Sequence, residues 1–201
     1  MSSILTKTGI VILAAGRSSR LGQSKQLLPF RGETLLKRAI HTAIQSEVAE
    51  IVVVLGANAD AHQKEITNER VDVVKNWDWE KGIGTSIACG VEKLTELLPH
   101  ATACIILLCD QPYISAELIK KMQKIHSSSA KGIVACKYAS TIGTPALFDK
   151  KYFKHIKLLK EDQGAKKLFS RFEDDLSTID FPEGETDIDT QQDYIQLLNT
   201  N

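Results

Sequence analysis

Short apolar runs alternate with amphipathic stretches along most of the chain. The first three runs are nearly continuous in Val, Ile and Leu, which is typical of strands that helices cover on both faces. We expect strands at Gly9–Leu13, Ile51–Leu55, Val71–Val74, Cys104–Leu108 and Gly132–Cys136. Helical periodicity between the runs predicts helices at about 33–46, 60–69, 85–98, 115–126 and 191–198. This alternation indicates an α/β fold with a mostly parallel sheet.

The regular alternation weakens after Ala139. We interpret Gly143-Thr144-Pro145 as a flexible segment, and the apolar run Ala146–Phe148 behind it need not be parallel to the other strands. Residues 161–168 are typical of a loop entering a short helix, and another strand is expected near 176–179. With 201 residues and 43% hydrophobic content, the chain can bury a substantial core. We expect one domain over residues 1–201, or one domain with a modest lobe.

Composition excludes several classes of partner. Lys and Arg together number 25, as do Asp and Glu, so no overall field attracts nucleic acid or an anionic membrane. The apolar run 10–15 is too short for a membrane span or a signal-peptide core, and we expect a cytoplasmic protein. The four cysteines form no C-x-x-C pair, which favours buried free thiols over a zinc site.

The segment from Leu13 to Lys25 joins an apolar strand to a loop of small residues with three cations. Gly16 and Gly22 allow close approach of backbone N–H groups to phosphate oxygens, and Arg17, Arg20 and Lys25 supply positive charge. These features predict a nucleotide site. The glycine spacing differs from that of a P-loop, and Gly82-Ile83-Gly84 lacks the third glycine of a dinucleotide fingerprint, so hydride chemistry is the weaker alternative.

Asp110 directly follows the predicted strand 104–108. The carboxyl end of a central strand is where α/β sheets bind ligands. An aspartate at this position either caps a turn or helix or binds a metal-bound phosphate, and its position favours neither.

Asp187 and Asp189 lie on one face if their segment is extended, and either could reach toward Asp110. Alternatively, Asp189 or Thr190 only caps the last helix. Mg²⁺ bound to a triphosphate takes one or two protein carboxylates, so two aspartates are sufficient.

A third segment, residues 76–86, couples two tryptophans to a glycine-containing turn before a helix. We expect Trp77 and Trp79 to pack as hydrophobic plugs, and Gly84, Thr85 and Ser86 to contact the nucleotide at the helix N-terminus. Two further segments are suited to backbone contacts with a second phosphate-bearing molecule. They are Gly143-Thr144-Pro145 and Gln163-Gly164-Ala165.

Six blocks in a fixed order, from about Ile10 to Leu198, carry a resemblance to a known family. The chain resembles the molybdenum cofactor nucleotidyltransferases of the MobA-like NTP transferase family, and within them the cytidylyl-transferring, MocA-like branch. The blocks are Leu13-Ala14-Ala15-Gly16-x3-Arg20-Leu21-Gly22-x2-Lys25, Gly82-x-Gly84-x-Ser86, Cys109-Asp110-Gln111-Pro112, Gly143-Thr144-Pro145, Asp162-Gln163-Gly164-Ala165 and Asp187-Ile188-Asp189-Thr190.

The resemblance implies a three-layer α/β/α nucleotidyltransferase (Rossmann-like) fold with a mostly parallel mixed sheet. It implies Mg²⁺-dependent transfer of CMP from CTP to molybdopterin or the molybdenum cofactor, with release of pyrophosphate. The nucleotide-binding half would be about 1–112 and the acceptor-binding half about 113–201. A molybdenum hydroxylase or its accessory protein would be a partner.

Roles of single residues follow from the same resemblance. Arg20 and Lys25 would touch the phosphates, Asp110 would bind magnesium, and Asp189 matches the second metal ligand, with Asp187 close enough to leave that choice open. The remaining expected contacts follow the motifs. The nucleotide would lie against Leu13, Ala14, Ala15, Gly16, Arg17, Gly84, Thr85 and Ser86, and the acceptor against Gly143, Thr144, Pro145 and Gly164.

Ala15 is the position that bears on the choice of base. Guanylyl-transferring relatives carry glycine there, so the alanine methyl favours a pyrimidine, by about 1–3 kcal/mol. Two alternatives stay open at this point. The chain could use another nucleotide or another phosphorylated acceptor, or it could be a non-catalytic accessory that delivers the cofactor to a molybdenum enzyme.

Overall fold

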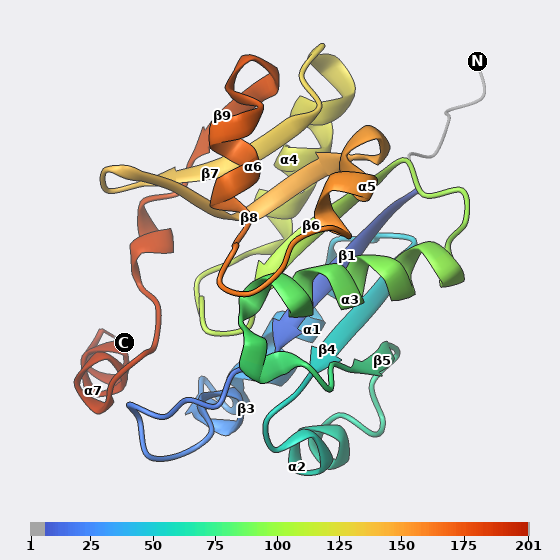
Figure 1. Ribbon diagram of the computed structural model, residues 1–201. Helices are drawn as coiled ribbons and strands as arrows, with labels where there is room; N and C mark the ends of the chain where they lie inside the picture. The colour runs from blue at the N-terminus through green and yellow to red at the C-terminus, as the bar shows by residue number, and fades with distance from the viewer. Residues whose placement is uncertain (1–6, 201) are drawn as a thin grey trace.

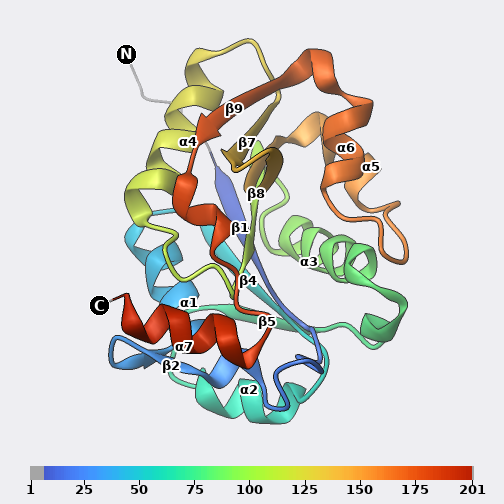
Figure 2. The same ribbon diagram turned by 90° about the vertical axis from the view of Figure 1, so that its left-hand side faces the viewer.

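A seven-stranded mixed sheet lies between two layers of helices in the computed structural model, which describes residues 7–200 (Figures 1 and 2). The strand order across the sheet is β5-β4-β1-β6-β8-β7-β9. These strands are β1 (Thr8–Ala14), β4 (Glu50–Leu55), β5 (Asp72–Lys75), β6 (Ala103–Leu108), β7 (Ile133–Tyr138), β8 (Thr141–Asp149) and β9 (Leu176–Asp180). A separate two-stranded ribbon joins β2 (Pro29–Phe30) to β3 (Glu33–Thr34).

The sheet is mostly parallel, as the sequence pattern predicts. β1 pairs in parallel with β4 and β6, β4 with β5, and β7 with β9, whereas β8 runs antiparallel to both β6 and β7. β7, β8 and β9 come from the second half of the chain and extend the sheet begun by the first half.

The prediction of a flexible segment at Gly143-Thr144-Pro145 is wrong, because these residues lie inside β8. The ladder with β7 pairs Ala135 with Ala146 but Cys136 with Gly143, so Thr144 and Pro145 fall where the register shifts. A proline lacks the N–H that a regular ladder needs, and a bulge is one of the few strand positions that accept it.

Helices cover both faces of the sheet. Figure 2 shows α1 and α4 on one side of the sheet and α3, α5 and α6 on the other. The buried residues form two matching clusters, since alternate residues of β1 and β4 face opposite layers. The helices are α1 (Leu35–Gln45), α2 (Ala59–Glu65), α3 (Ile83–Leu97), α4 (Ala116–Ser128), α5 (Phe153–Ile156), α6 (Lys166–Arg171) and α7 (Gln191–Asn199).

Helix starts follow local chemistry. The side chains of Thr34, Ser115 and Thr190 accept hydrogen bonds from the third residue of α1, α4 and α7, respectively. Gly90 brings α3 close to the sheet, because a Cβ there would lie 2.3 Å from Cγ1 of Val11. α3 is therefore fixed against β1 and β4.

α7 packs away from the sheet, over the β2–β3 ribbon. Tyr194 and Leu197 of this helix join Ile188, Leu21 and Phe30 in a third buried cluster. This cluster holds the end of the chain beside the loop that follows β1 (Figure 2). Across residues 7–200, none of the helices has the length and apolar character to cross a bilayer.

Candidate functional site

The loop after β1 is held in shape by one buried glutamine. The side-chain amide of Gln26 donates to the carbonyl oxygens of Ala14 (3.2 Å) and Gly16 (2.9 Å). Its oxygen accepts from the hydroxyls of Ser24 (2.7 Å) and Ser18 (3.2 Å). Residues 14–26, which we call the phosphate loop after the phosphate contacts expected of them, therefore close on themselves around this side chain.

Sequence reasoning missed Gln26. It stands in the 3₁₀ turn Lys25–Leu27, where a polar residue is expected on the surface, yet it is only 1% exposed. A buried amide must have hydrogen-bond partners. In this protein they come from the loop that the glutamine supports.

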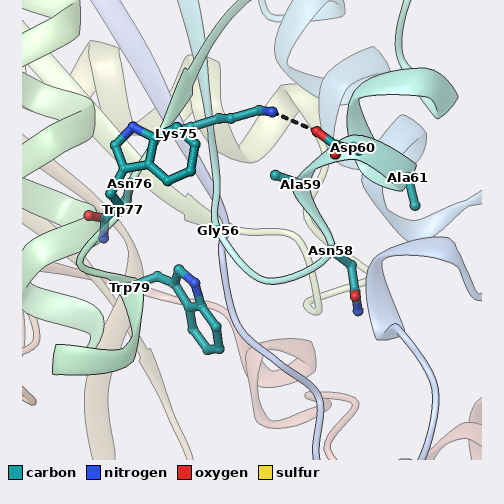
Figure 3. A pocket seen from close by; sticks show the side chains of 9 residues that line it. All are labelled: Gly56, Asn58, Ala59, Asp60, Ala61, Lys75, Asn76, Trp77 and Trp79. Carbon is teal, nitrogen blue, oxygen red and sulfur yellow. Dashed lines mark hydrogen bonds and ion pairs between the residues drawn. The ribbon is translucent and has the colours of Figure 1, made fainter.

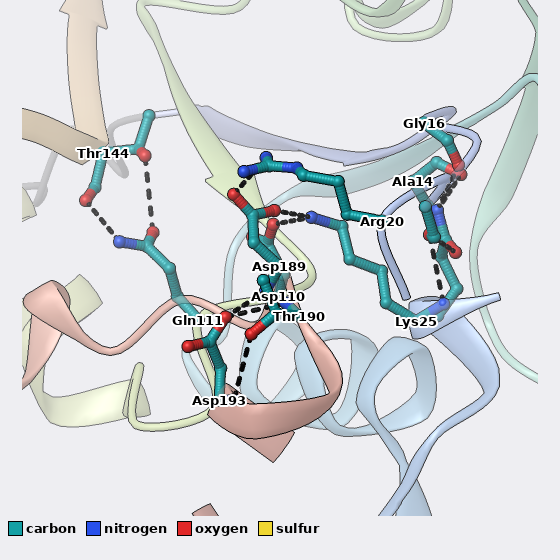
Figure 4. Close-up of polar contacts among 12 residues, drawn as sticks. Ala14, Gly16, Arg20, Lys25, Asp110, Gln111, Thr144, Asp189, Thr190 and Asp193 are labelled. Atoms are coloured by element: carbon teal, nitrogen blue, oxygen red, sulfur yellow. Dashed lines mark hydrogen bonds and ion pairs between the residues drawn. The ribbon is translucent and has the colours of Figure 1, made fainter. Parts of the chain in front are cut away.

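Lys25, Asp110 and Asp189 converge at the carboxyl ends of β1 and β6 (Figure 4). The Lys25 ammonium donates to Asp110 Oδ2 and, over 3.0 Å, to Asp189 Oδ1. The Arg20 guanidinium donates to the other oxygen of Asp189 over 2.5 Å. The two aspartates are 79 positions apart in the sequence and share one lysine in the structure.

The backbone explains why Asp189 reaches this place. The Ile188 N–H donates to the carbonyl oxygen of Asp110 over 3.2 Å, and the Ile188 side chain is fully buried in the third cluster. Thr190 caps α7 with Asp193 in a capping box, so the Asp189 side chain is not needed as a cap. The alternative that Asp189 is the helix cap is therefore wrong.

Charges at the site shift the pKa values of its members. Burial acts to lower the pKa of Lys25, but the Asp110 carboxylate beside it raises the pKa above its ordinary value. Burial acts to raise the pKa of Asp189, and the hydrogen bond from Lys25 holds it below the ordinary value. Burial and then the charges of Asp110 and Asp189 raise the pKa of Asp187. The carboxylates of Asp110, Asp187 and Asp189 are thus close enough to interact electrostatically.

The donor set fits a divalent cation. Asp110 Oδ1 is buried and has no hydrogen-bond partner among the described residues. No group of three or more His, Cys, Asp or Glu side chains suited to a metal ion occurs within residues 7–200, but Mg²⁺ on a nucleotide needs only one or two carboxylates. Asp110 and Asp189 are the residues that could hold it.

A cavity of about 210 Å³ opens beside these groups. Of the predicted nucleotide contacts, five line it together with Asp110: Leu13, Ala15, Gly16, Lys25 and Ser86. Four others do not line it. Ala14 is buried beneath the loop. Arg17 is exposed, and its guanidinium carbon lies 5.8 Å from the Trp79 ring centre. Gly84 and Thr85 donate hydrogen bonds to the carbonyl oxygens of Glu161 and Gly82, respectively.

Gly84 packs against the second half of the chain. Its N–H donates to the Glu161 carbonyl oxygen over 2.8 Å, and a Cβ on Gly84 would lie within 2.9 Å of that oxygen. Thr85 bonds to the Gly82 carbonyl oxygen, and Asn76 donates to both Thr85 and Ser86. The glycine at this position therefore serves a close approach of two backbones.

A second hollow of about 460 Å³ lies at the ends of β4 and β5, next to the first cavity (Figure 3). Trp79 lines both. The prediction that Trp77 is a hydrophobic plug is wrong, since it is 84% exposed, with the Lys75 ammonium 5.9 Å from its ring centre. The prediction for Trp79 is confirmed, because it packs against the core cluster of α3.

The expected acceptor residues divide into two places. Thr144 is tied to the site through Gln111, whose amide donates to the Thr144 carbonyl oxygen (3.1 Å) and to that of Gly184 (3.2 Å) (Figure 4). Gly143 and Pro145 flank it in β8 and are buried. Gly164 opens the turn before α6, next to the Glu161 segment that contacts Gly84.

Comparison with known proteins identifies the family. A model of the MobA-like NTP transferase domain matches residues 10–176. The chain belongs to the MobA-like NTP transferase family. The predicted fold is confirmed, since solved nucleotidyltransferases share this Rossmann-like α/β architecture.

Three curated relatives of this MobA-like chain have different names. Nicotine blue oxidoreductase of Paenarthrobacter nicotinovorans is 37% identical over 58% of this chain, which spans only 55% of that protein. Purine catabolism protein PucB of Bacillus subtilis is 30% identical over an alignment that covers 79% of this chain and 78% of PucB. Molybdenum cofactor cytidylyltransferase of Escherichia coli is 26% identical over 60% of each chain.

Two solved structures are similar over nearly their full length. Rv0371c of Mycobacterium tuberculosis superposes with a TM-score of 0.83 at 31% identity, covering 96% of this chain and 98% of that one. A complex of Rv0371c with manganese has a TM-score of 0.81 at 28% identity, covering 98% of this chain and 100% of that one. Manganese has thus been found with a structurally similar protein.

Proposed function

We propose that this MobA-like protein transfers CMP from CTP to the terminal phosphate of molybdopterin or the molybdenum cofactor and releases pyrophosphate. The observation that carries the proposal is the meeting of Lys25, Asp110 and Asp189 beside a cavity lined by the phosphate loop. The name of the E. coli relative supports this choice of substrates.

The chemistry needs no side-chain nucleophile. An oxygen of the acceptor phosphate attacks the α-phosphorus of CTP, and the bond from that phosphorus to the bridging oxygen of the β-phosphate breaks in line. Both reactants are anions, so the main obstacle is their repulsion. Lys25 and Arg20 would leave the aspartates to contact the phosphates and stabilise the charge on the leaving pyrophosphate. Mg²⁺ held by Asp110 and Asp189 would add charge neutralisation of the phosphate oxygens.

Ala15 supports the choice of a pyrimidine. It is 5% exposed, it lines the cavity, and its carbonyl oxygen accepts from the Ala57 N–H over 3.0 Å. The methyl group is therefore held in place and reduces the room for a purine.

The acceptor would lie against the second half of the chain, about residues 113–201, with the nucleotide against residues 1–112. Gly143, Thr144 and Pro145 approach the site through Gln111, and Gly164 through the contact between Glu161 and Gly84. The cytidylylated product would pass to a molybdenum hydroxylase or its accessory protein.

Pyrophosphate release tests this proposal. Purified protein is incubated with CTP, GTP or ATP, with and without molybdopterin, and with Mg²⁺, Mn²⁺ or EDTA. The expected result is release from CTP only when both molybdopterin and a divalent cation are present. Equal rates with GTP would refute the pyrimidine choice, and release with a sugar phosphate in place of molybdopterin would refute the acceptor.

The variant Asp110→Asn separates an enzyme from a carrier. It keeps the shape of the side chain but removes the charge beside Lys25, so turnover should fall by about 100-fold or more while molybdopterin binding persists. Asp174→Asn, at an exposed position before β9, is the matched control and should leave turnover unchanged. Near wild-type transfer by Asp110→Asn would overturn the metal assignment.

A further inference from the structure

A buried histidine underlies the phosphate loop and has no part in the chemistry just described. His62 of α2 is 0% exposed, and its Nε2 lies 2.5 Å from the hydroxyl oxygen of Ser24. Its other ring nitrogen, Nδ1, has no hydrogen-bond partner among residues 7–200. Burial lowers the pKa of His62, which favours the neutral ring.

The hydrogen bonds fix the direction of this contact. The Ser24 hydroxyl has one proton and donates it to Gln26 Oε1 over 2.7 Å, so the Nε2–H of His62 donates to Ser24. Nδ1 then carries a lone pair without a partner. His62, Ser24 and Gln26 form a chain that ends on the carbonyl oxygens of Ala14 and Gly16.

Stability alone does not account for an imidazole here. A buried polar atom without a partner lowers stability, so the unpaired Nδ1 offsets part of what the bond from His62 to Ser24 contributes. The functional end of the chain of hydrogen bonds is the phosphate loop. What the histidine supports is therefore the conformation of that loop.

We propose that His62 is a positioning residue for the nucleotide, which acts through Ser24 and Gln26 to hold the phosphate loop in its triphosphate-binding conformation. This inference rests on the proposed function for its ligand, and on the hydrogen bonds of His62, Ser24 and Gln26 for the loop. α2 is well placed for the role, because the segment before it also donates from Ala57 N–H to the Ala15 carbonyl oxygen.

Two readouts test the proposal on His62→Leu. The first is hydrogen exchange of the Leu21 and Lys25 amides, which bond to the carbonyl and hydroxyl oxygens of Ser18, both over 3.1 Å. Without nucleotide, exchange of these two amides should be faster by about fivefold or more in the variant than in the wild type. The second is the KM for CTP, which should rise by about tenfold, or 1.4 kcal/mol, with kcat unchanged.

Companion variants make the result specific. His62→Gln places an amide nitrogen near Ser24 and should restore most of the loop protection and the low KM, and it serves if the leucine variant does not fold. His62→Leu should add nothing to Ser24→Ala, because Ser24→Ala already removes the hydroxyl that links His62 to Gln26. Lys64→Ala, at an exposed position of the same helix, should change neither readout.

Unchanged exchange at Leu21 and Lys25, or an unchanged KM, in a folded His62→Leu protein would overturn the proposal. A fall in kcat with constant KM would also overturn it, since the histidine would then act on the chemical step. If the wild-type protein releases no pyrophosphate from CTP while the loop amides still respond to His62→Leu, the proposed function fails and the role of His62 in the loop is supported.

Discussion

Replacing Lys25 with methionine should strengthen the binding of a divalent cation when no nucleotide is present. The Lys25 ammonium lies between Asp110 and Asp189 and hydrogen-bonds to both carboxylates. A metal ion that binds these carboxylates must displace the ammonium. Lys25→Met keeps most of the length of the side chain, which becomes one atom shorter, and removes its charge.

The magnitude follows from the contacts that the ion must break. The side chains of Lys25 and Asp110 are 15% and 12% exposed, so water screens this pair little. One hydrogen bond to a charged group contributes about 1.5–3 kcal/mol net. Since about 1.4 kcal/mol is tenfold in Kd, the variant should bind Mn²⁺ about 10- to 100-fold more tightly than the wild type. With CTP present the order should reverse for turnover, because the phosphates lose a cation.

Titration calorimetry with Mn²⁺, supported by electron paramagnetic resonance of the free ion, measures this affinity without reference to catalysis. Lys121→Met on the exposed side of α4 removes the same charge far from the site and is the matched control. If Lys25→Met binds Mn²⁺ no more tightly than the wild type, the lysine does not compete for the cation position, and the reasoning is refuted.

Three other perturbations have defined outcomes. Ala15→Gly should lower the ratio of kcat/KM for CTP to kcat/KM for GTP by about tenfold, measured from initial rates with each nucleotide. An unchanged ratio would mean that the Ala15 methyl group does not select the base. Gly90→Ala should lower the free energy of unfolding in urea by about 1–3 kcal/mol, because its methyl would collide with Val11; full stability would mean that α3 shifts freely. Burial acts to raise the pKa of Asp175, but hydrogen bonds from Lys151 and Tyr152 hold it below its ordinary value. Its stabilising effect is therefore present at neutral pH and is lost as the pH falls below the ordinary value of 3.8 and through the lowered pKa. The difference in free energy of unfolding between wild type and Asp175→Asn, measured in urea, should shrink over that range, and a constant difference would contradict the prediction.

The sheet could be predicted from sequence where its strands are buried on both faces. β1, β4 and β6 are continuous apolar runs, and their pattern gives both strand and parallel packing. β8 is harder to predict from sequence, because Gly143-Thr144-Pro145 consists of residues that favour turns. These residues fit into a strand through the bulge in the pairing with β7. Local sequence does not carry that information, since the bulge depends on the partner strand.

The carboxylates of the candidate site could be predicted because their neighbours are distinctive. Asp110 follows a buried strand, and Asp189 flanks the apolar Ile188 that carries it to the sheet edge. Gln26 and His62 could not be predicted in the same way. Both are polar residues in polar surroundings along the chain, and only the tertiary structure shows that they are buried and bonded through Ser24.

The hydrogen bond from Ile188 to Asp110 has a consequence for the newly made protein. Translation delivers the glycine-containing loop first, Asp110 later, and Asp189 a further 79 positions along the chain. A nascent polypeptide without the segment around Ile188 would thus lack one of the two carboxylates that meet Lys25. The three side chains come together when that segment docks on Asp110.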